Sequence, residues 1–293
     1  MTTSNSSLIE RIRAELVDYG DGATTLASAV SSTSATSVTL TSSLSVSEGG
    51  FLHIDSESML VLEVNRTTNV CTVQRGSKGS TAATHTSGTL VYINLDYSNL
   101  QILQAINGAL SYAYPRLYAL TINEDLETID DTSEYDFPDG FTADKIVRVE
   151  METYDGSGLY QIDRFWDMLD SDTVRIYGTR SEGLNIRLVG MSKFTAGVLS
   201  DNLDSDFPDD DSVAIDYLVA RSCSSLLRST QGRVAQLDTF QGITDRFTAG
   251  QPYVPINTSN QYRIEAEALL RRCAMEPPDM YLPHPNRRMY GVG

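Results

Sequence analysis

The sequence predicts an α+β fold in which a helical core carries an inserted small β-barrel or sandwich domain, a second β unit and an extended C-terminal tail. Three observations lead to this class. Apolar residues recur at helical spacing near both ends and in the middle of the chain. The stretches between them hold short β-branched or alternating runs separated by glycine-rich turns. The 293 residues are 41% hydrophobic and 21% charged, which is typical of globular proteins.

The first predicted element is a helix over residues 8–18, within a core segment of residues 1–22. Its apolar side chains fall on one helical stripe: Leu8, Ile12 and Leu16. Ser7 is the predicted N-cap, with Glu10 three residues later as in a capping box. The opening residues are polar, so no secretory signal is expected.

The inserted β domain is predicted over residues 23–97. Val38 and Leu40 alternate with threonines, which indicates a strand. Further strands are expected over residues 51–55, 59–64, 70–74 and 90–93, with glycine-rich turns between them. Because the domain lies between two predicted helices, it would project from the helical core as a lobe.

A core helix is predicted over residues 98–120, with Ser98 as its N-cap and Pro115 expected to kink or end it. A second β unit follows over residues 121–200. Its signals are alternation around Val147, a hairpin turn at residues 155–158, and strands over 174–177 and 186–189 joined by a turn at 178–183.

The last third combines an acidic loop and core helices over residues 201–276 with an extended arm over residues 277–293. Helices are expected over residues 212–229 and 259–275, and prolines end the second one. The arm is too rich in proline to bury much of itself, so it is expected either to lack order or to be ordered by a partner.

The formal net charge of −17 is concentrated in one region. Residues 121–211 carry 23 acidic and 7 basic side chains, a net charge of −16. A tightly held nucleic acid needs a basic surface, so DNA binding of that kind is not expected. The acidic region is either a solvated surface or a surface that repels a polyanion or meets a basic partner.

No catalytic or metal-binding pattern is found, so the chain is expected not to be an enzyme and to need no cofactor or metal. The three histidines are far apart and lack the spacing of a metal site: His53, His85 and His284. The three cysteines also lack such spacing, and free thiols are expected: Cys71, Cys223 and Cys273. No apolar run of about 18 residues occurs, so no membrane contact is expected.

Three segments carry a further pattern, residues 50–59, 73–83 and 85–91. They contain a Gly-x-x-x-Ile-Asp-x-Glu strand pair, an Arg-Gly-x-x-Gly turn and a histidine followed by glycine. The motif residues are Asp55, Glu57, Arg75, Gly76, Gly79, His85 and Gly88. This pattern resembles a β module of structural proteins in tailed bacteriophages. Ser80 departs from the module's contiguous Gly-Thr.

The order of elements resembles that of a head-to-tail adaptor (connector) protein of a long-tailed phage. Three pieces carry this likeness: residues 8–16, 106–110 and 135–138. The resemblance implies a structural virion protein at the head–tail junction, made in the host cytoplasm. It implies a closed ring of about twelve copies that joins the portal to the tail and lines the DNA channel. The implied partners are further copies of the chain, the portal protein, and a tail-side neck or tail terminator protein. DNA would pass through without specific binding.

The resemblance also suggests two sets of site residues. A portal-docking arm would use arginines as cations and tyrosines as anchors: Arg271, Arg272, Tyr281, Arg287, Arg288 and Tyr290. Acids that line the DNA channel are expected in the loop before residue 212: Asp204, Asp206, Asp209, Asp210 and Asp211.

Two other classes of function stay open. One is a different virion component, such as a tail terminator or baseplate protein, because these carry similar modules. The other is a tail-associated sugar-binding module or glycosidase. Trp166 is the single tryptophan, which weakens the case for stacking on sugars.

Overall fold

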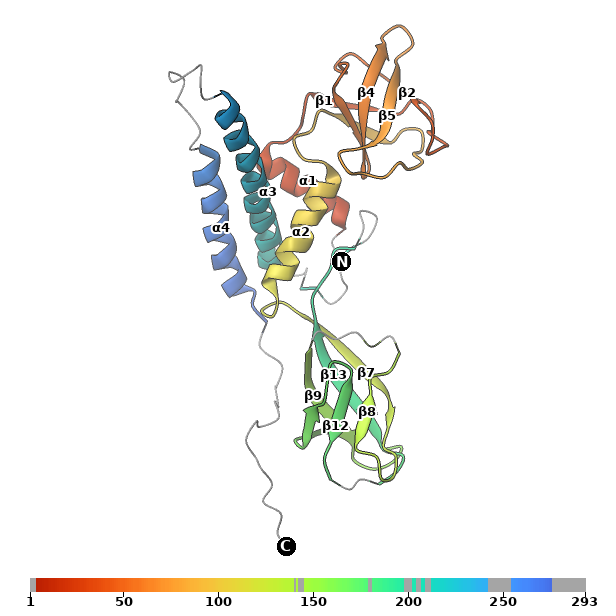
Figure 1. The fold of residues 1–293 in the computed structure, drawn as a ribbon, viewed down its shortest axis with the longest axis vertical. Helices are drawn as coiled ribbons and strands as arrows, with labels where there is room; N and C mark the ends of the chain where they lie inside the picture. Colours follow the sequence, from red (N-terminus) through yellow and green to blue (C-terminus); the bar gives the residue numbers. More distant parts are fainter. Residues whose placement is uncertain are drawn as a thin grey trace. The chain divides into compact units, whose positions relative to one another are not determined.

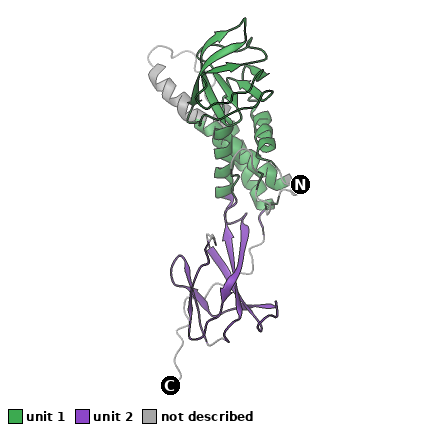
Figure 2. Cartoon of the chain, turned by 90° about the vertical axis from the view of Figure 1, so that its right-hand side faces the viewer, with its two compact units in different colours: residues 1–112, 195–273 green, residues 113–194, 274–293 purple. Residues whose placement is uncertain are grey.

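The computed structural model describes residues 4–139, 141, 145–178, 181–197, 202–203, 207–208, 212–241 and 254–275. The chain forms two compact units (Figure 2). Unit 1 contains residues 1–112 and 195–273, and unit 2 contains residues 113–194 and 274–293. The described residues form a mixed α+β fold with four helices, a six-stranded antiparallel half-barrel sheet and two smaller antiparallel sheets.

Unit 1 contains the helices, which are α1 (Asn5–Leu16), α2 (Asn99–Ala113), α3 (Ser212–Gln241) and α4 (Val254–Arg272). The helices α3 and α4 lie side by side, and α1 packs against α3 (Figure 1). Two buried hydrogen bonds of 3.0 Å join α3 to α4, because the hydroxyls of Ser224 and Ser259 each donate to the carbonyl of the other residue. No helix in the described ranges is both long and apolar enough to cross a membrane.

The predicted cap of the first helix is wrong. Ser4, not Ser7, is the N-cap of α1, and its side chain accepts the backbone N–H of Ser7. The helix ends at Val17, which adopts the left-handed conformation with φ of 57°. The helix starts earlier than predicted because Asn5, Leu8 and Ile9 are all buried. Their packing stabilises an additional turn at its N-terminus.

The other helix boundaries also differ from the prediction. The helix α2 ends at Ala113, close to Pro115, as that proline indicates. The helix α3 runs on to Gln241, because no proline follows residue 229 in this stretch and a single glycine is tolerated. The helix α4 begins at Val254, with Pro255 in its first turn, where a missing backbone N–H costs nothing.

The β domain of unit 1 is one antiparallel sheet in the order β1-β6-β3-β4-β5-β2. Its strands are β1 (Gly22–Thr25), β2 (Ser37–Thr39), β3 (Phe51–Ile54), β4 (Glu57–Asn65), β5 (Val70–Ser77) and β6 (Leu90–Ile93). The chain next to the two edge strands meets at a bridge between Leu26 and Leu40. Alternate aliphatic side chains, among them Val38, Leu52 and Val73, fill a core of their own.

Unit 2 contains two antiparallel sheets over one core. Its strands are β7 (Ala119–Glu127), β8 (Glu134–Asp136), β9 (Lys145–Glu152), β10 (Tyr160–Asp163), β11 (Trp166–Met168), β12 (Thr173–Ile176) and β13 (Asn185–Ser192). The four-stranded sheet has the order β10-β9-β13-β7, and the three-stranded sheet has the order β11-β12-β8. Val149, Trp166 and Leu188 pack between them.

Two of the predicted turns in unit 2 differ in outcome. The hairpin turn at residues 155–158 is confirmed, because β9 and β10 pair antiparallel on either side of it. The segment 178–183 does join β12 to β13, but these two strands belong to different sheets. β12 and β13 are therefore not hydrogen-bonded to each other, which local sequence does not encode.

Candidate functional site

The motif residues of the β domain converge on one buried carboxylate. Glu57 begins β4, and its side chain is fully buried. It accepts two hydrogen bonds of 2.7 Å from the Nε and Nη2 of Arg75 in a paired geometry. It also accepts the backbone N–H groups of Gly76 at 3.1 Å and Ala83 at 2.9 Å. Each oxygen of this carboxylate therefore meets several donors.

Strand pairing brings these groups together. β4 and β5 are antiparallel neighbours with Ser58 opposite Ser77, which places Glu57 beside Arg75 and Gly76 at the end of β5. Gly76 has a φ of +61°, and a Cβ there would lie 3.1 Å from the carbonyl oxygen of Ser80. Glycine is therefore required for its N–H to reach the carboxylate.

Arg75 also hydrogen-bonds to backbone groups of other segments around the Glu57 carboxylate. Its remaining donors reach backbone carbonyls, with Nη1 donating to Ser32 at 3.0 Å and to Ala35 at 3.1 Å. Nη2 also donates to the carbonyl of Ala83. All five N–H groups of the guanidinium are used, so this side chain has none left for a ligand.

His85 completes the cluster by bridging two carboxylates. Its Nδ1 lies 2.8 Å from Asp55 Oδ2, and its Nε2 lies 2.9 Å from Glu57 Oε2. Ionised carboxylates only accept hydrogen bonds, so both ring nitrogens donate and the ring is an imidazolium. The cluster therefore pairs two cations with two anions.

The pKa values reflect this arrangement. Burial alone raises the pKa of Glu57, but the hydrogen bonds it accepts, chiefly from Arg75, lower it to about 2. Burial alone lowers the pKa of His85, but hydrogen bonds to Asp55 and Glu57 raise it above 6.5. Both shifts favour the charged forms of Glu57 and His85, which strengthens their pairing within the β domain.

The other motif glycines have a conformational role. Gly79 has a φ of +78° and Gly88 a φ of +84°, and a Cβ at either position would meet open space. Sequence reasoning missed the carbonyls of Ser32 and Ala35 and the N–H of Ala83. These are backbone groups, so no side chain in the sequence marks them.

A second polar pair in the β domain was not predicted. Ser58 Oγ lies 3.0 Å from Nδ1 of His53, as in a nucleophile–base pair. Both residues are buried, so no substrate reaches them. Burial, followed by the charges of Lys78 and Arg13, lowers the pKa of His53 to about 3. This histidine is therefore neutral and structural.

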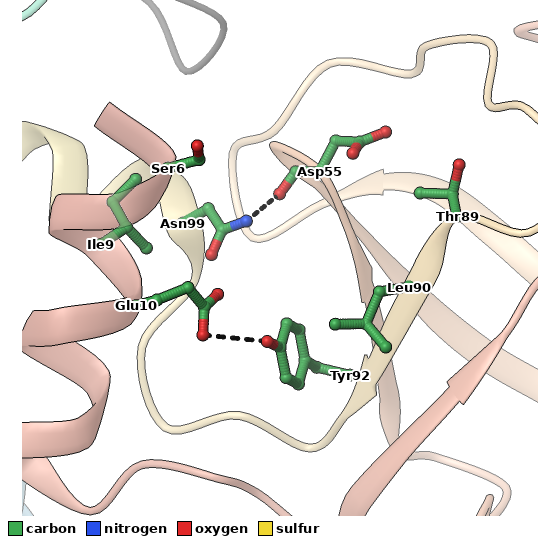
Figure 3. A pocket seen from close by; sticks show the side chains of 8 residues that line it. All are labelled: Ser6, Ile9, Glu10, Asp55, Thr89, Leu90, Tyr92 and Asn99. Atoms are coloured by element: carbon green, nitrogen blue, oxygen red, sulfur yellow. Dashed lines mark hydrogen bonds between the residues drawn. The ribbon is translucent and has the colours of Figure 1, made fainter. Parts of the chain in front are cut away.

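An open pocket of about 170 Å³ lies between the helices and the β domain of unit 1 (Figure 3). It is lined by Ser6, Ile9, Glu10, Asp55, Thr89, Leu90, Tyr92 and Asn99. The hydroxyl of Tyr92 donates to Glu10 at 3.0 Å, and the amide of Asn99 donates to the carbonyl of Asp55. These polar groups satisfy one another across the pocket. Among the described residues, no cluster of histidine, cysteine and carboxylate side chains suits a metal ion.

The remaining predicted site residues are mostly outside the described ranges. Arg271 and Arg272 are exposed in the last turn of α4. The other arm residues and the expected channel acids lie outside the described residues: Tyr281, Arg287, Arg288, Tyr290, Asp204, Asp206, Asp209, Asp210 and Asp211. The three cysteines are buried and form no disulfide within the described residues.

Comparisons of the chain with protein-family profiles, curated protein sequences and solved structures find no match.

Proposed function

We propose that the chain is a structural protein of a tailed-phage virion, an adaptor whose ring of about twelve copies joins the portal to the tail. The observation that carries this proposal is the saturated cluster around Glu57. Glu57, Arg75, Gly76 and His85 of the motif lie together, and they hydrogen-bond to one another within the β domain. Such a cluster serves folding and assembly rather than chemistry.

The way the β domain joins the helices supports a helical adaptor core with an inserted domain. Asp18 follows α1 and accepts the backbone N–H groups of Asp96 at 3.0 Å and Tyr97 at 3.1 Å, just before α2. Arg13 pairs with Asp18 at 3.0 Å, and both side chains are buried. The two segments that connect the β domain to the helices, residues 17–21 and 94–98, are therefore hydrogen-bonded to each other and to α1.

The charge distribution supports a protein that lies beside DNA without binding it. Residues 121–211 carry a net charge of −16, and repetition around a ring multiplies this charge. A channel wall of that sign repels phosphates and lets DNA slide. In this proposal Asp204, Asp206, Asp209, Asp210 and Asp211 face the channel, while Arg271, Arg272 and the arm dock on acidic groups of the portal.

The test is cryo-electron microscopy of the intact particle, with wild-type chain and with residues 277–293 deleted. The expected result is a ring between portal and tail that the truncated chain no longer fills. A matched control is Arg263→Ala, which removes an exposed arginine of α4 and keeps the arm. Full occupancy by the truncated chain would contradict docking through the arm.

A second candidate is a different tailed-phage component, such as a baseplate protein. The Glu57 cluster favours it equally, because all its members belong to the β domain and none to the helices. Density for this chain at the tail tip would select that candidate. Absence of the chain from the particle would exclude both and leave the glycosidase and sugar-binding alternatives.

A further inference from the structure

The outer face of the three-stranded sheet in unit 2 is well defined by strand register. Trp166, Val174 and Tyr135 point into the core from β11, β12 and β8. The alternate residues therefore form the outer face. Across its middle, Asp167 lies opposite Arg175, which in turn lies opposite Glu134.

This outer face exposes large apolar side chains. Phe165 is 56% exposed, Leu169 47% and Tyr177 42%. Phe165 and Tyr177 are cross-strand neighbours, since the N–H of Tyr177 donates to the carbonyl of Phe165 at 2.7 Å. An aromatic pair at one end and a leucine at the other thus flank the central polar row.

The same face carries excess negative charge. Arg175 is its single cation among the described residues, and it pairs with Glu134 through Nε at 3.1 Å. The remaining carboxylates belong to Asp136, Asp167, Asp170 and Asp172, all of which are exposed. We call the outer-face residues 134, 136, 165, 167, 169, 175 and 177, with the turn acids 170 and 172, the acidic patch. It fits an occupant with cations beside apolar side chains.

The chain itself supplies such an occupant. The described part ends at Met275, whose N–H donates to the carbonyl of Arg116 at 2.9 Å and whose side chain packs against the core of unit 2. Eighteen residues follow. From residue 281 onward they include two arginines, Arg287 and Arg288, and two tyrosines, Tyr281 and Tyr290, and they include no acidic side chain.

The length and the charge of this C-terminal segment both suit a contact with the acidic patch. Arg287 is the twelfth residue after Met275, and an extended chain of that length spans up to about 40 Å. We propose that, before assembly, the arm of residues 277–293 docks on the acidic patch of its own chain, with Arg287 and Arg288 against its carboxylates. Tethering to the same unit makes this contact intramolecular and concentration-independent. The contact is independent of the portal, so it can be tested apart from the proposed function.

The first test places a photo-crosslinking phenylalanine analogue at Phe165 in the full chain. The expected product is an internal crosslink to residues 277–293, found by mass spectrometry of the monomer band. The matched control carries the analogue at Leu44, an 81% exposed residue of the β domain, and should give no such product. Absence of arm crosslinks from position 165, or crosslinks only between chains, would overturn the proposal.

The second test measures trypsin cleavage after Arg287 and Arg288. Asp167→Arg reverses an exposed charge of the acidic patch and should speed this cleavage about five-fold, because surface ion pairs are individually weak. Glu63→Arg makes the same change at an exposed position of β4 and should leave the rate unchanged. Equal rates for wild type and Asp167→Arg would contradict the proposal even where a crosslink forms.

Discussion

At the scale of single residues, Glu57 shows how one buried charge organises a small domain. Its carboxylate binds a guanidinium, an imidazolium and two backbone N–H groups, which lie on β5 and the chain that follows it. A buried ion pair need not stabilise more than an apolar pair would, but removing one partner leaves the other charge buried and unpaired.

Glu57→Gln is therefore expected to lower the free energy of unfolding of the β domain by about 3–5 kcal/mol. Trp166 lies in unit 2, so its fluorescence does not report this domain. The measurement is urea-dependent labelling of Cys71, which is buried in β5. Glu63→Gln on the same strand is the control and should cost less than about 0.5 kcal/mol. Similar effects of both substitutions would contradict the structural role of Glu57.

His85 makes the stability of the β domain depend on pH. Its folded pKa is raised, so its contribution is complete below the unfolded value of 6.5 and is lost as pH rises through the folded pKa. The loss of stability in His85→Gln should therefore be larger at about pH 5.5 than at about pH 9. Calorimetry of the two proteins at both values tests this expectation.

His53 provides the contrast. Its folded pKa is lowered to about 3, so the stability it contributes is present above 6.5 and is lost as pH falls toward 3. His53→Gln should then have a constant effect between about pH 7 and pH 9. A His85→Gln effect that is equally constant over the whole range would show that the imidazolium is absent.

At the scale of elements, the Arg13–Asp18 pair stabilises the two segments that connect the helices to the β domain. Asp18→Ala leaves a buried guanidinium without its carboxylate and is expected to cost about 3–5 kcal/mol. Hydrogen exchange of the Asp96 and Tyr97 amides should rise together with that loss. Asp96→Ala is the control, because its side chain is exposed and its amide remains in place. Unchanged exchange in Asp18→Ala would contradict this role.

Sequence predicted the elements better than their ends. The helices and the strands predicted over 51–55 and 90–93 are present in the structure, the first of these strands ending one residue earlier at Ile54. The shift of the first cap from Ser7 to Ser4 could not be predicted, because both are serines and burial of Asn5 decides between them. Likewise, which sheet receives β12 or β13 depends on packing across the core.

The candidate site, too, could be predicted only in part from the sequence. The motif residues were selected through a resemblance, which predicts neither their burial nor their hydrogen bonds. Three of the groups that saturate the cluster are backbone atoms of Ser32, Ala35 and Ala83, which are far from Glu57 in sequence. They lie in loops outside the strands, so the local pattern could not place them beside Arg75 and Glu57.

At the scale of the whole molecule, the net charge of −17 opposes close association of copies. Exposed charges repel one another over a screening length of about 10 Å at 0.1 M salt, and this length falls to about 3 Å at 1 M. If the proposed ring forms, its assembly should increase between these salt concentrations, as measured by sedimentation velocity. A chain with Asp204, Asp206, Asp209, Asp210 and Asp211 changed to asparagine should depend less on salt. Assembly that weakens with salt would contradict this account.

The same five acids, changed to lysine, test the channel itself. Ring copies with reversed charge would attract phosphates, so DNA should leave the particle more slowly. The measurement is the rate of DNA release from particles that carry wild-type or variant chains. Normal release from fully occupied variant particles would place these residues away from the DNA path.

The adjacent connecting segments of the β domain have a consequence for how such a chain could have arisen. The N–H of Asp21 donates to the carbonyl of Ile93 at 2.8 Å, so the domain leaves and rejoins the helices at neighbouring points. A segment with adjacent ends can be spliced into a gene, or lost from it, while the host protein keeps its fold. The β domain thus meets the geometric condition for an insertion that is gained or lost as one unit.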